Sequence, residues 1–294
     1  MALSADLVDF LQSKLSALLN RQVQINSTKP VSGGSINQAY CLHSNAGKYM
    51  LKLNSRYTYP NMFACESDGL KAIAATCTIA VPQVILQDEL DDDSFLILQW
   101  IETRKPTEAA SKLLGRQLAQ MHRNSTGYFG LDSDNYMGSL PQSNRKHHNW
   151  TSFFIEERLQ PMVKIGVDKK LLNHADVAKF ETLYNKLNVL FEEEPSSLIH
   201  GDLWGGNYLI STDATPYLID PAVSYGNREF DIAMTTLFGG FSESFYSAYH
   251  ESFPLNIGWQ ERIALWNLYP LLLHLNLFGA GYLGQVRDGV EAYV

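Results

Sequence analysis

One stretch of the sequence concentrates residue types that can do chemistry. It reads HGDLWGGN at residues 200–207 and is followed by YLID at residues 217–220. Asp202 and Asn207 share a loop rich in glycine, between two short hydrophobic runs that read as strands. A turn after the second run predicts an antiparallel return strand, which would bring Asp220 beside Asn207.

These polar groups suit a reaction at a bound metal ion. An amide oxygen from Asn207 and a carboxylate from Asp220 are hard ligands of the kind that Mg²⁺ accepts. Asp202 can take a proton from an attacking hydroxyl. An aspartate base, then an asparagine and a later aspartate for the metal, is the order of parts in kinases. Two alternatives stay open: these residues are caps and turn formers, or His200, Asp202 and Asp220 form a hydrolase metal site, although zinc sites usually hold more imidazole or thiolate ligands.

A second pattern lies in the first third of the chain. Lys52 sits within the hydrophobic run YMLKL at residues 49–53, and a charge placed inward on a strand needs a partner. Glu66 shares the apolar face of the following helical stretch with Leu70 and Ile73. We therefore expect an ion pair that directs the lysine at nucleotide phosphates. The alternative is a lysine that reaches to solvent and a surface glutamate.

Two further segments are compatible with nucleotide binding. Gly33 and Gly34 lie in a turn before Lys52, where small residues let backbone N–H groups approach phosphate oxygens, although no Walker sequence follows. An exposed strand end offers an adenine ring a flat apolar slot with backbone polar groups at its edge. The residues there are Leu98, Gln99, Trp100 and Ile101. Alone, these segments read equally well as a β-turn and an edge strand.

The hydrophobic patterns predict two parts of different character. Before residue 101 they indicate helices at residues 4–20 and 62–75 among strands, with two strands at residues 81–86 and 95–100 and a solvated acidic loop at residues 88–93. After residue 101 they are mainly helical, with Thr107 as the cap of a helix ending near His122, a polar connector at residues 124–149 and helices at residues 150–165, 174–192 and 228–237. We expect an α+β fold with a nucleotide-binding lobe at residues 1–101, a catalytic and acceptor-binding lobe at residues 102–294, and a site between them.

Composition excludes several classes of protein. The 294 residues hold 23 Lys and Arg against 31 Asp and Glu, and a net charge of −8 disfavours nucleic acid as a partner. Residues 263–286 carry no Asp, Glu, Lys or Arg, but their Asn, His and Pro favour a buried helix pair over a membrane span. Three cysteines without a CxxC pair, and an acidic start where a signal peptide would be basic, predict a reducing compartment, the cytoplasm.

Several motifs in the sequence resemble those of a known family. The motifs HGDLWxGN at residues 200–207 and IDPAVxYGxRExDxAM at residues 219–234 resemble those of the fructosamine (ketoamine) kinases. So do GGxIN at 33–37, FLIL at 95–98, PQxN at 141–144, Trp150 and LFGxGY at 277–282. The resemblance spans nearly the whole chain. It implies a protein-kinase-like fold, related more distantly to aminoglycoside and choline kinases, and ATP-dependent phosphorylation of a sugar hydroxyl on a ketoamine.

The resemblance assigns roles by position. Asp202 resembles the catalytic base, Asn207 and Asp220 the Mg²⁺ ligands, and Lys52 and Glu66 the pair that positions the ATP phosphates. The segment at residues 98–101 resembles the hinge that meets adenine.

Three departures from the family pattern stand out. Pro221-Ala222 follows Asp220 in place of Phe-Gly, which suits small-molecule kinases and argues against an activation switch. Ser35 stands where many members have cysteine, and Gln99 where many have glutamate.

Several residues are candidates for binding the acceptor or supporting the loop. Trp204 lies two residues from the base, and its indole could form a wall for the sugar or its amine substituent, unless it packs in the core. His274 and Asn276, with Phe278, are weaker candidates from the uncharged segment. Asp231 either hydrogen-bonds the catalytic loop or only favours the start of its helix.

Two rival functions follow from the same motifs. One is a kinase for another small acceptor, such as an aminoglycoside or an amino alcohol, which an acidic protein would also suit. The other is a pseudokinase that binds nucleotide as a sensor, which the presence of all five expected polar residues disfavours. The sequence does not indicate the oligomeric state.

Overall fold

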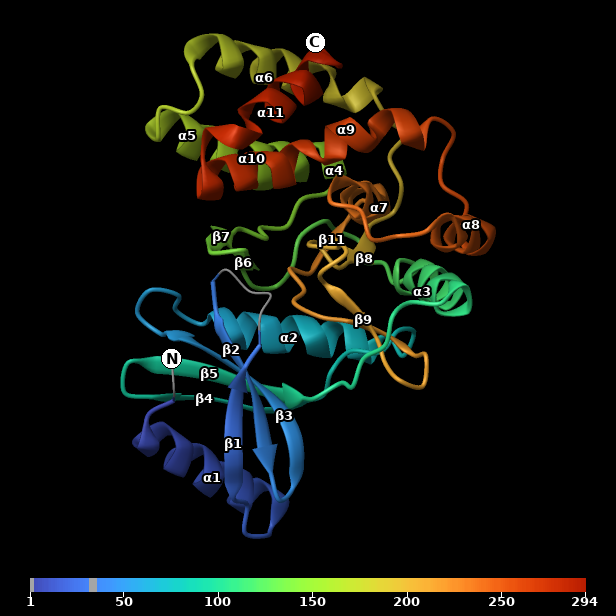
Figure 1. The fold of residues 1–294 in the computed structure, drawn as a ribbon. Coiled ribbons are helices and arrows are strands. Elements are labelled where there is room, and N and C mark those ends of the chain that lie inside the picture. Colours follow the sequence, from blue (N-terminus) through green and yellow to red (C-terminus); the bar gives the residue numbers. More distant parts are fainter. Residues whose placement is uncertain (1–2, 32–35) are drawn as a thin grey trace.

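The structure is a computed structural model that describes residues 3–31 and 36–294. Its N-terminal part is an antiparallel sheet in the order β1-β2-β3-β5-β4, with helices α1 and α2 on either side (Figure 1). The elements are α1 (Ala5–Leu19), β1 (Ile25–Pro30), β2 (Gln38–Ser44), β3 (Gly47–Ser55), α2 (Met62–Ala75), β4 (Val84–Leu90) and β5 (Asp93–Gln99).

Strand alternation decides which side chains meet which helix. Leu51 of β3 packs in one hydrophobic cluster with Leu11 of α1. Lys52, the next residue, points to the other face, where its register partner Leu96 packs with Phe63 of α2. The same alternation that builds two layers of core therefore aims one lysine at helix α2.

The C-terminal part is mainly helical and contains three two-stranded sheets (Figure 1). Its first elements are α3 (Glu108–Met121), β6 (Asn135–Met137), β7 (Leu140–Gln142), α4 (Trp150–Phe153), the π-helical η1 (Phe154–Leu159), α5 (Gln160–Asp168), α6 (His174–Lys186) and η2 (Leu187–Val189). The remaining elements are β8 (Ser197–Ile199), β9 (Tyr208–Ile210), β10 (Pro216–Leu218), β11 (Ser224–Gly226), α7 (Arg228–Leu237), α8 (Glu243–Ser252), η3 (Trp259–Arg262), α9 (Ile263–Trp266), α10 (Leu268–Phe278), η4 (Ala280–Tyr282) and α11 (Leu283–Glu291). A sheet-rich part before a helical part is the α+β arrangement that the sequence predicts.

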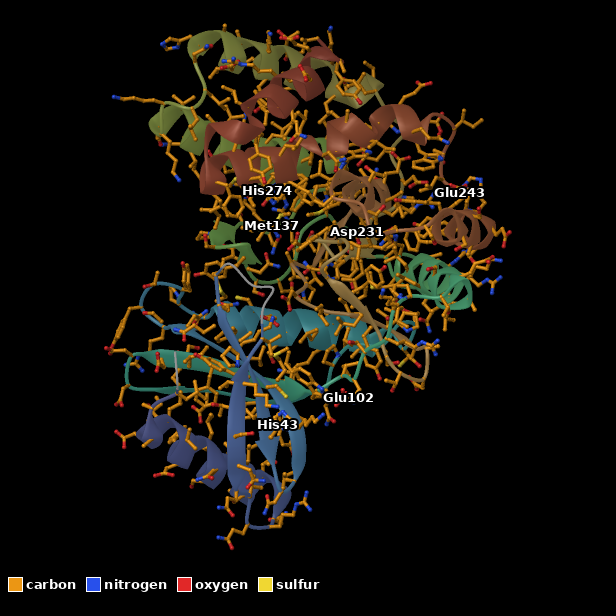
Figure 2. The ribbon with its side chains drawn as sticks, viewed as in Figure 1. His43, Glu102, Met137, Asp231, Glu243 and His274 are labelled. Carbon is orange, nitrogen blue, oxygen red and sulfur yellow. The ribbon has the colours of Figure 1, made fainter. Side chains whose placement is uncertain are left out.

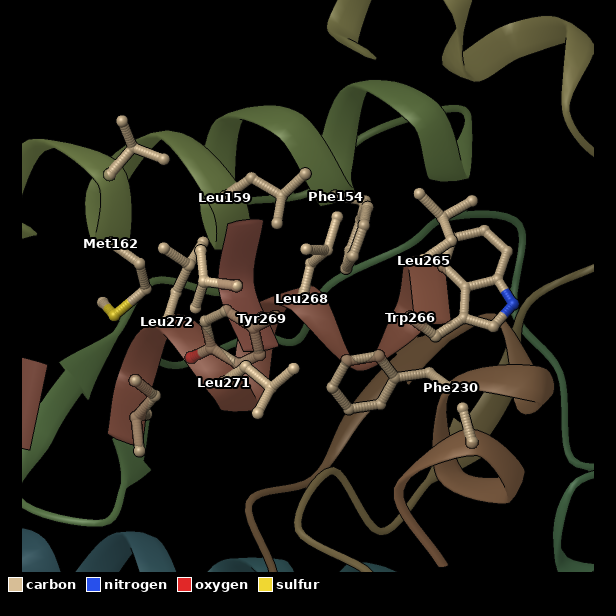
Figure 3. Close-up of a cluster of buried hydrophobic side chains, with 14 of the residues drawn as sticks. Phe154, Leu159, Met162, Phe230, Leu265, Trp266, Leu268, Tyr269, Leu271 and Leu272 are labelled. Carbon is tan, nitrogen blue, oxygen red and sulfur yellow. The ribbon is translucent and has the colours of Figure 1, made fainter. Parts of the chain in front are cut away.

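The core of the helical part is rich in aromatic side chains. Trp150 of α4 and Trp266 of α9 are fully buried and meet edge to face, with ring centroids 6.1 Å apart. Figure 3 shows Phe154, Leu268 and Tyr269 in the same cluster. This packing buries one face of α10 against α5 and α9.

Several boundaries differ from those predicted. The acidic run at residues 88–93 is not a loop: Asp88 belongs to β4 and Asp93 to β5, and the turn between them holds only two residues. The connector at residues 124–149 contains the short β6–β7 hairpin. The helix predicted from Thr107 begins as expected, because the threonine hydroxyl accepts a hydrogen bond from the Ala110 N–H at 3.3 Å.

The uncharged segment at residues 263–286 forms α9, α10, η4 and the start of α11. Within the described residues, no helix combines the length and the apolar character needed to cross a membrane.

Candidate active site

The loop at residues 200–207 is fixed by a buried histidine. His200 donates from Nε2 to the carbonyl of Ile219 at 2.9 Å, and its Nδ1 accepts from the Asp202 N–H at 3.2 Å. Burial lowers the pKa of His200, so the ring stays neutral with its proton on Nε2. Gly201 has φ +80°, and a Cβ on it would lie 2.1 Å from the carbonyl oxygen of Ala222. Only glycine fits this turn.

Asp231 supports the same loop from helix α7. Its carboxylate is fully buried and accepts hydrogen bonds from the backbone N–H groups of His200 at 2.6 Å and Gly201 at 2.9 Å. His122 contacts it at 3.1 Å and is itself bonded to the Tyr249 hydroxyl. Of the two roles open from the sequence, support of the loop is confirmed.

Asp202 and Asn207 contact each other across the loop. The Asn207 Nδ2 donates to the Asp202 backbone carbonyl at 2.8 Å and to its Oδ2 at 2.9 Å. Burial, and then the charge of Asp220, raise the pKa of Asp202 to about 7, while the bond from Asn207 opposes the shift. Asp202 is therefore a carboxylate whose proton affinity suits a base near neutral pH.

Asp220 reaches Asn207 along the return strand. Strands β9 and β10 pair antiparallel as expected, and the Ile219 N–H donates to the Asn207 carbonyl at 3.0 Å. Asp220 has φ 54°, and its side chain, 44% exposed, forms a short ion pair with Lys52. The bend turns the carboxylate out of the strand and toward the sheet of the N-terminal part.

Lys52 and Glu66 form the ion pair expected between β3 and α2. Lys52 Nζ lies 2.6 Å from Glu66 Oε1, and both side chains are buried. Burial alone would lower the pKa of Lys52, but the charges of Asp220 and Glu66 outweigh it and raise the pKa. Burial raises the pKa of Glu66, against the opposing charge of Lys52. The lysine is thus a fixed cation between the two parts of the chain.

These groups converge on one cleft with a cavity volume of about 200 Å³. The predicted site residues that line it are Lys52, Glu66, Asp202, Trp204, Asn207, Asp220 and His274. In Figure 2, Met137 and His274 lie near each other where the β6–β7 hairpin meets α10, and both also line the cleft.

One side of the cleft is aromatic. Trp204 folds back over Gly206, where a Cβ would lie 2.3 Å from the indole, so the ring position requires glycine there. The indole meets Phe238 edge to face at 6.0 Å, and Phe238 lies 4.9 Å from the ring of His274. His274 donates from Nδ1 to the Pro270 carbonyl at 2.7 Å, which leaves Nε2 as its remaining polar atom.

The segment predicted to meet adenine lies outside this cavity. Leu98 packs in the cluster between β5 and α2, and Ile101 is also buried. Gln99 is exposed, and its N–H donates to the carbonyl of Gln83 at 2.9 Å. Trp100 is half-buried.

Asn276 also lies away from the cleft, in the core. It is buried, and its Nδ2 donates to the carbonyl of Met162 at 2.9 Å, so it packs α10 against α5. This placement does not support the acceptor contact predicted for Asn276. Gly33 and Gly34 lie outside the described residues.

The sequence interpretation missed part of the lining. The cleft also contains Asn37, Cys65, Tyr136, Met137, Leu273 and Leu277. Tyr136 and Met137 come from a polar connector and Leu273 from a run of three leucines, in which nothing singles them out. Three others had a signal: Cys65 directly precedes Glu66, and Asn37 and Leu277 lie in motifs that resemble the family pattern.

The donor atoms fit a magnesium ion and not a hydrolase zinc site. The Nδ2 of Asn207 is engaged by Asp202, so its amide oxygen and the Asp220 carboxylate are the atoms that could hold a cation. Both ring nitrogens of His200 are engaged with the backbone, which removes it as a ligand. Within the part of the chain that the structure describes, the group of His, Cys, Asp or Glu side chains close enough to hold a metal is His147, Glu156 and Glu157. It lies outside this cleft, and Arg145 already pairs with both glutamates.

The fold and the site together define a phosphotransferase of the protein-kinase-like class. An aminoglycoside phosphotransferase structure covers 97% of this chain with 98% of its own, at a TM-score of 0.60 and 13% identity, a likeness of fold alone. A crystal structure of a putative fructosamine-3-kinase from Thermobifida fusca is much more similar, with a TM-score of 0.86, 32% identity and coverage of 97% and 99%.

The chain belongs to the fructosamine kinase family, whose model matches residues 8–294. A probable ketoamine kinase of Synechocystis is 38% identical over 95% of this chain and 94% of its own length. The ketosamine-3-kinase of Mus musculus is 34% identical over 92% of this chain and 97% of its own.

Proposed function

We propose that this protein transfers the γ-phosphate of ATP to a sugar hydroxyl of a ketoamine, the adduct formed when a sugar glycates an amine. The observation that carries the proposal is the convergence of Asp202, Asn207, Asp220, Lys52 and Glu66 on one cleft in a chain of this family. All three cysteines are free thiols, which is consistent with the reducing cytoplasm, where we place the reaction.

Asp202 acts on the acceptor hydroxyl, and Lys52 acts on the ATP phosphates. Asp202 orients the acceptor hydroxyl and takes its proton as the oxygen attacks the γ-phosphorus in line with the leaving ADP oxygen. Lys52, held by Glu66, places a positive charge on the ATP phosphates. Asn207 and Asp220 would hold Mg²⁺, which neutralises charge on the phosphates when it is bound. Most of the acceleration comes from positioning and from fixed charges, because the site brings every partner to one place before reaction.

The acceptor occupies the aromatic side of the cleft. Trp204 gives the sugar an apolar face for its C–H groups, and it attracts the positive charge of a protonated amine. His274 offers Nε2 as a hydrogen-bond acceptor for a hydroxyl or ammonium group. Met137 and Phe278 close the wall.

A panel of acceptors tests this function. We expect ATP consumption with fructosyl-, ribulosyl- or erythrulosyl-lysine and none with kanamycin or choline as the only acceptor. NMR of the product identifies the phosphorylated carbon, which we expect to be carbon 3, as the name of the mouse relative indicates for that enzyme. Phosphate transfer to an aminoglycoside but to no ketoamine would replace this function with the rival one.

A further inference from the structure

Three buried polar side chains form a chain of hydrogen bonds beneath the segment that follows Asp220. The Tyr269 hydroxyl donates to Gln142 Oε1 at 2.7 Å, and Gln142 Nε2 donates to Asn135 Oδ1 at 2.9 Å. Asn135 Nδ2 then donates to the backbone carbonyl of Val223 at 2.8 Å. The bonds run in one direction, from α10 through the β6–β7 hairpin to the backbone three residues beyond Asp220.

This chain is satisfied only when the segment at residues 221–223 keeps its position. Buried polar groups that lose their partners carry a large free-energy penalty, and linked hydrogen bonds strengthen one another. Gln142 Nε2 also lies 3.4 Å from the carbonyl oxygen of Ala222, so it contacts the segment directly. A shift of this segment would leave Asn135 and Gln142 with unpaired atoms.

The far end of the chain is anchored in the rigid core. Tyr269 is almost fully buried, and its ring lies 6.0 Å from that of Phe230 and 5.6 Å from the Arg158 guanidinium. Figure 3 shows it surrounded by the hydrophobic side chains of α9 and α10. A hydroxyl fixed in this way is a stable reference point for the loop.

The hairpin also reaches the N-terminal part of the chain. The Tyr136 hydroxyl donates to the Pro60 carbonyl at 3.0 Å, and the Cys65 thiol donates to the Asp134 carbonyl at 3.4 Å. Gly69 lies on α2, as Cys65 does, and a Cβ on it would lie only 3.2 Å from Pro221. The helix that carries Glu66 and the segment that follows Asp220 are therefore held against each other and against the hairpin.

We propose that Tyr269, Gln142 and Asn135 are positioning residues, which fix the segment at residues 221–223 and so aim the Asp220 carboxylate before nucleotide binds. The proposal rests on the function proposed above. Tyr269 and Gln142 act only through other residues, because neither lines the cleft.

The test is Tyr269→Phe, which removes one hydroxyl and keeps the ring. We expect kcat to fall about tenfold, the equivalent of about one hydrogen bond, while the acceptor KM stays within about twofold. Without nucleotide, the backbone amides of residues 222–225 should exchange hydrogen about tenfold faster than in the wild type, and those of α6 at an unchanged rate.

The matched control is Tyr293→Phe. That hydroxyl accepts from the Leu265 N–H at 3.1 Å and donates to the Glu261 carbonyl at 2.5 Å, on the C-terminal helices. Tyr293→Phe should lower the melting temperature about as much as Tyr269→Phe does. It should leave kcat and hydrogen exchange at residues 222–225 unchanged. Uniformly faster exchange in Tyr269→Phe, or an unchanged kcat, would overturn the proposal.

A second variant tests whether the residues act as one unit. Gln142→Ala alone should lower kcat by a similar factor, and the double variant Gln142→Ala/Tyr269→Phe should be little worse than either, because both interrupt the same chain. Multiplication of the two kcat effects would contradict the proposal. Failure of the proposed function looks different: the wild type itself would then transfer no phosphate to any ketoamine, while the exchange experiment would still report on the chain of hydrogen bonds.

Discussion

The two ends of the cleft are built on opposite principles. At the charged end the groups hold one another through ion pairs and hydrogen bonds: Lys52 contacts Glu66 and Asp220, and Asp202 contacts Asn207. At the aromatic end the side chains pack against one another with few polar contacts. Phe278 is 56% exposed and Phe238 is 42% exposed.

The difference matches the demands on each end. Phosphate transfer requires charges at fixed positions, because electrostatic stabilisation depends on preorganisation. An acceptor of variable amine substituent requires an apolar surface that tolerates different shapes. Substitutions at the charged end should therefore change the rate, and those at the aromatic end the acceptor affinity.

The largest effect should come from Asp202→Asn. Loss of the base should lower kcat by about 10²–10⁴-fold, while ATP binding, measured by calorimetry, stays close to that of the wild type. Asp213→Asn, in the turn between β9 and β10, is the control and should be fully active. Near-normal turnover in Asp202→Asn would remove the base from the mechanism and leave fixed charges as the contribution of the charged end.

Lys52→Met should have the next largest effect. It removes the charge that faces the phosphates and leaves Glu66 and Asp220 as unpaired like charges, so kcat/KM for ATP should fall about 10–100-fold. Lys48→Met on the same strand breaks only the exposed pair with Glu102, and should change little. If both variants lose activity equally, the buried pair has no special role.

Trp204→Ala tests the role of the aromatic end. Its loss should raise the acceptor KM about tenfold, the scale of one aromatic contact, with the ATP KM and kcat within about threefold of the wild type. Trp204→Phe keeps an aromatic face and should recover most of the affinity. An unchanged acceptor KM in Trp204→Ala would show that the indole packs the loop and does not bind the sugar.

The smallest effect concerns His274 and pH. Burial lowers its pKa from the ordinary value of 6.5, so below that pH the unfolded chain binds a proton that the folded chain excludes. The contribution of His274 to the free energy of unfolding should therefore fall from about pH 7 to about pH 5, and His274→Gln should remove that contribution. Urea titrations at both pH values measure it, and identical pH slopes would place the imidazole in water.

The charged end could be predicted because its residue types are unusual in their settings. A lysine inside a hydrophobic strand and a polar loop between short strands need an explanation from chemistry, and strand alternation then gives their direction. Aromatic and leucine residues at the other end look the same whether they line a cleft or fill a core. The β6–β7 hairpin was missed because its strands of three residues leave no periodic pattern.

Asn276 shows how far helical spacing could have helped. Residues that are two positions apart in a helix point about 200° away from each other around its axis. His274 and Asn276 therefore cannot share a face. The structure turns His274 to the cleft and Asn276 to α5. The acidic run at residues 88–93 shows the converse: composition favours a loop, but register with β3 and β5 draws it into the sheet.

The two hydrogen bonds of the His200 ring limit where the proton that Asp202 takes from the acceptor can go. Both ring nitrogens are occupied by backbone groups, and Asn207 presents N–H groups to Asp202, so the loop offers no relay. A proton taken up at Asp202 must depart through the mouth of the cleft, to water or to the departing phosphate ester. Either route passes through the space that the product occupies, so resetting the base is tied to product escape.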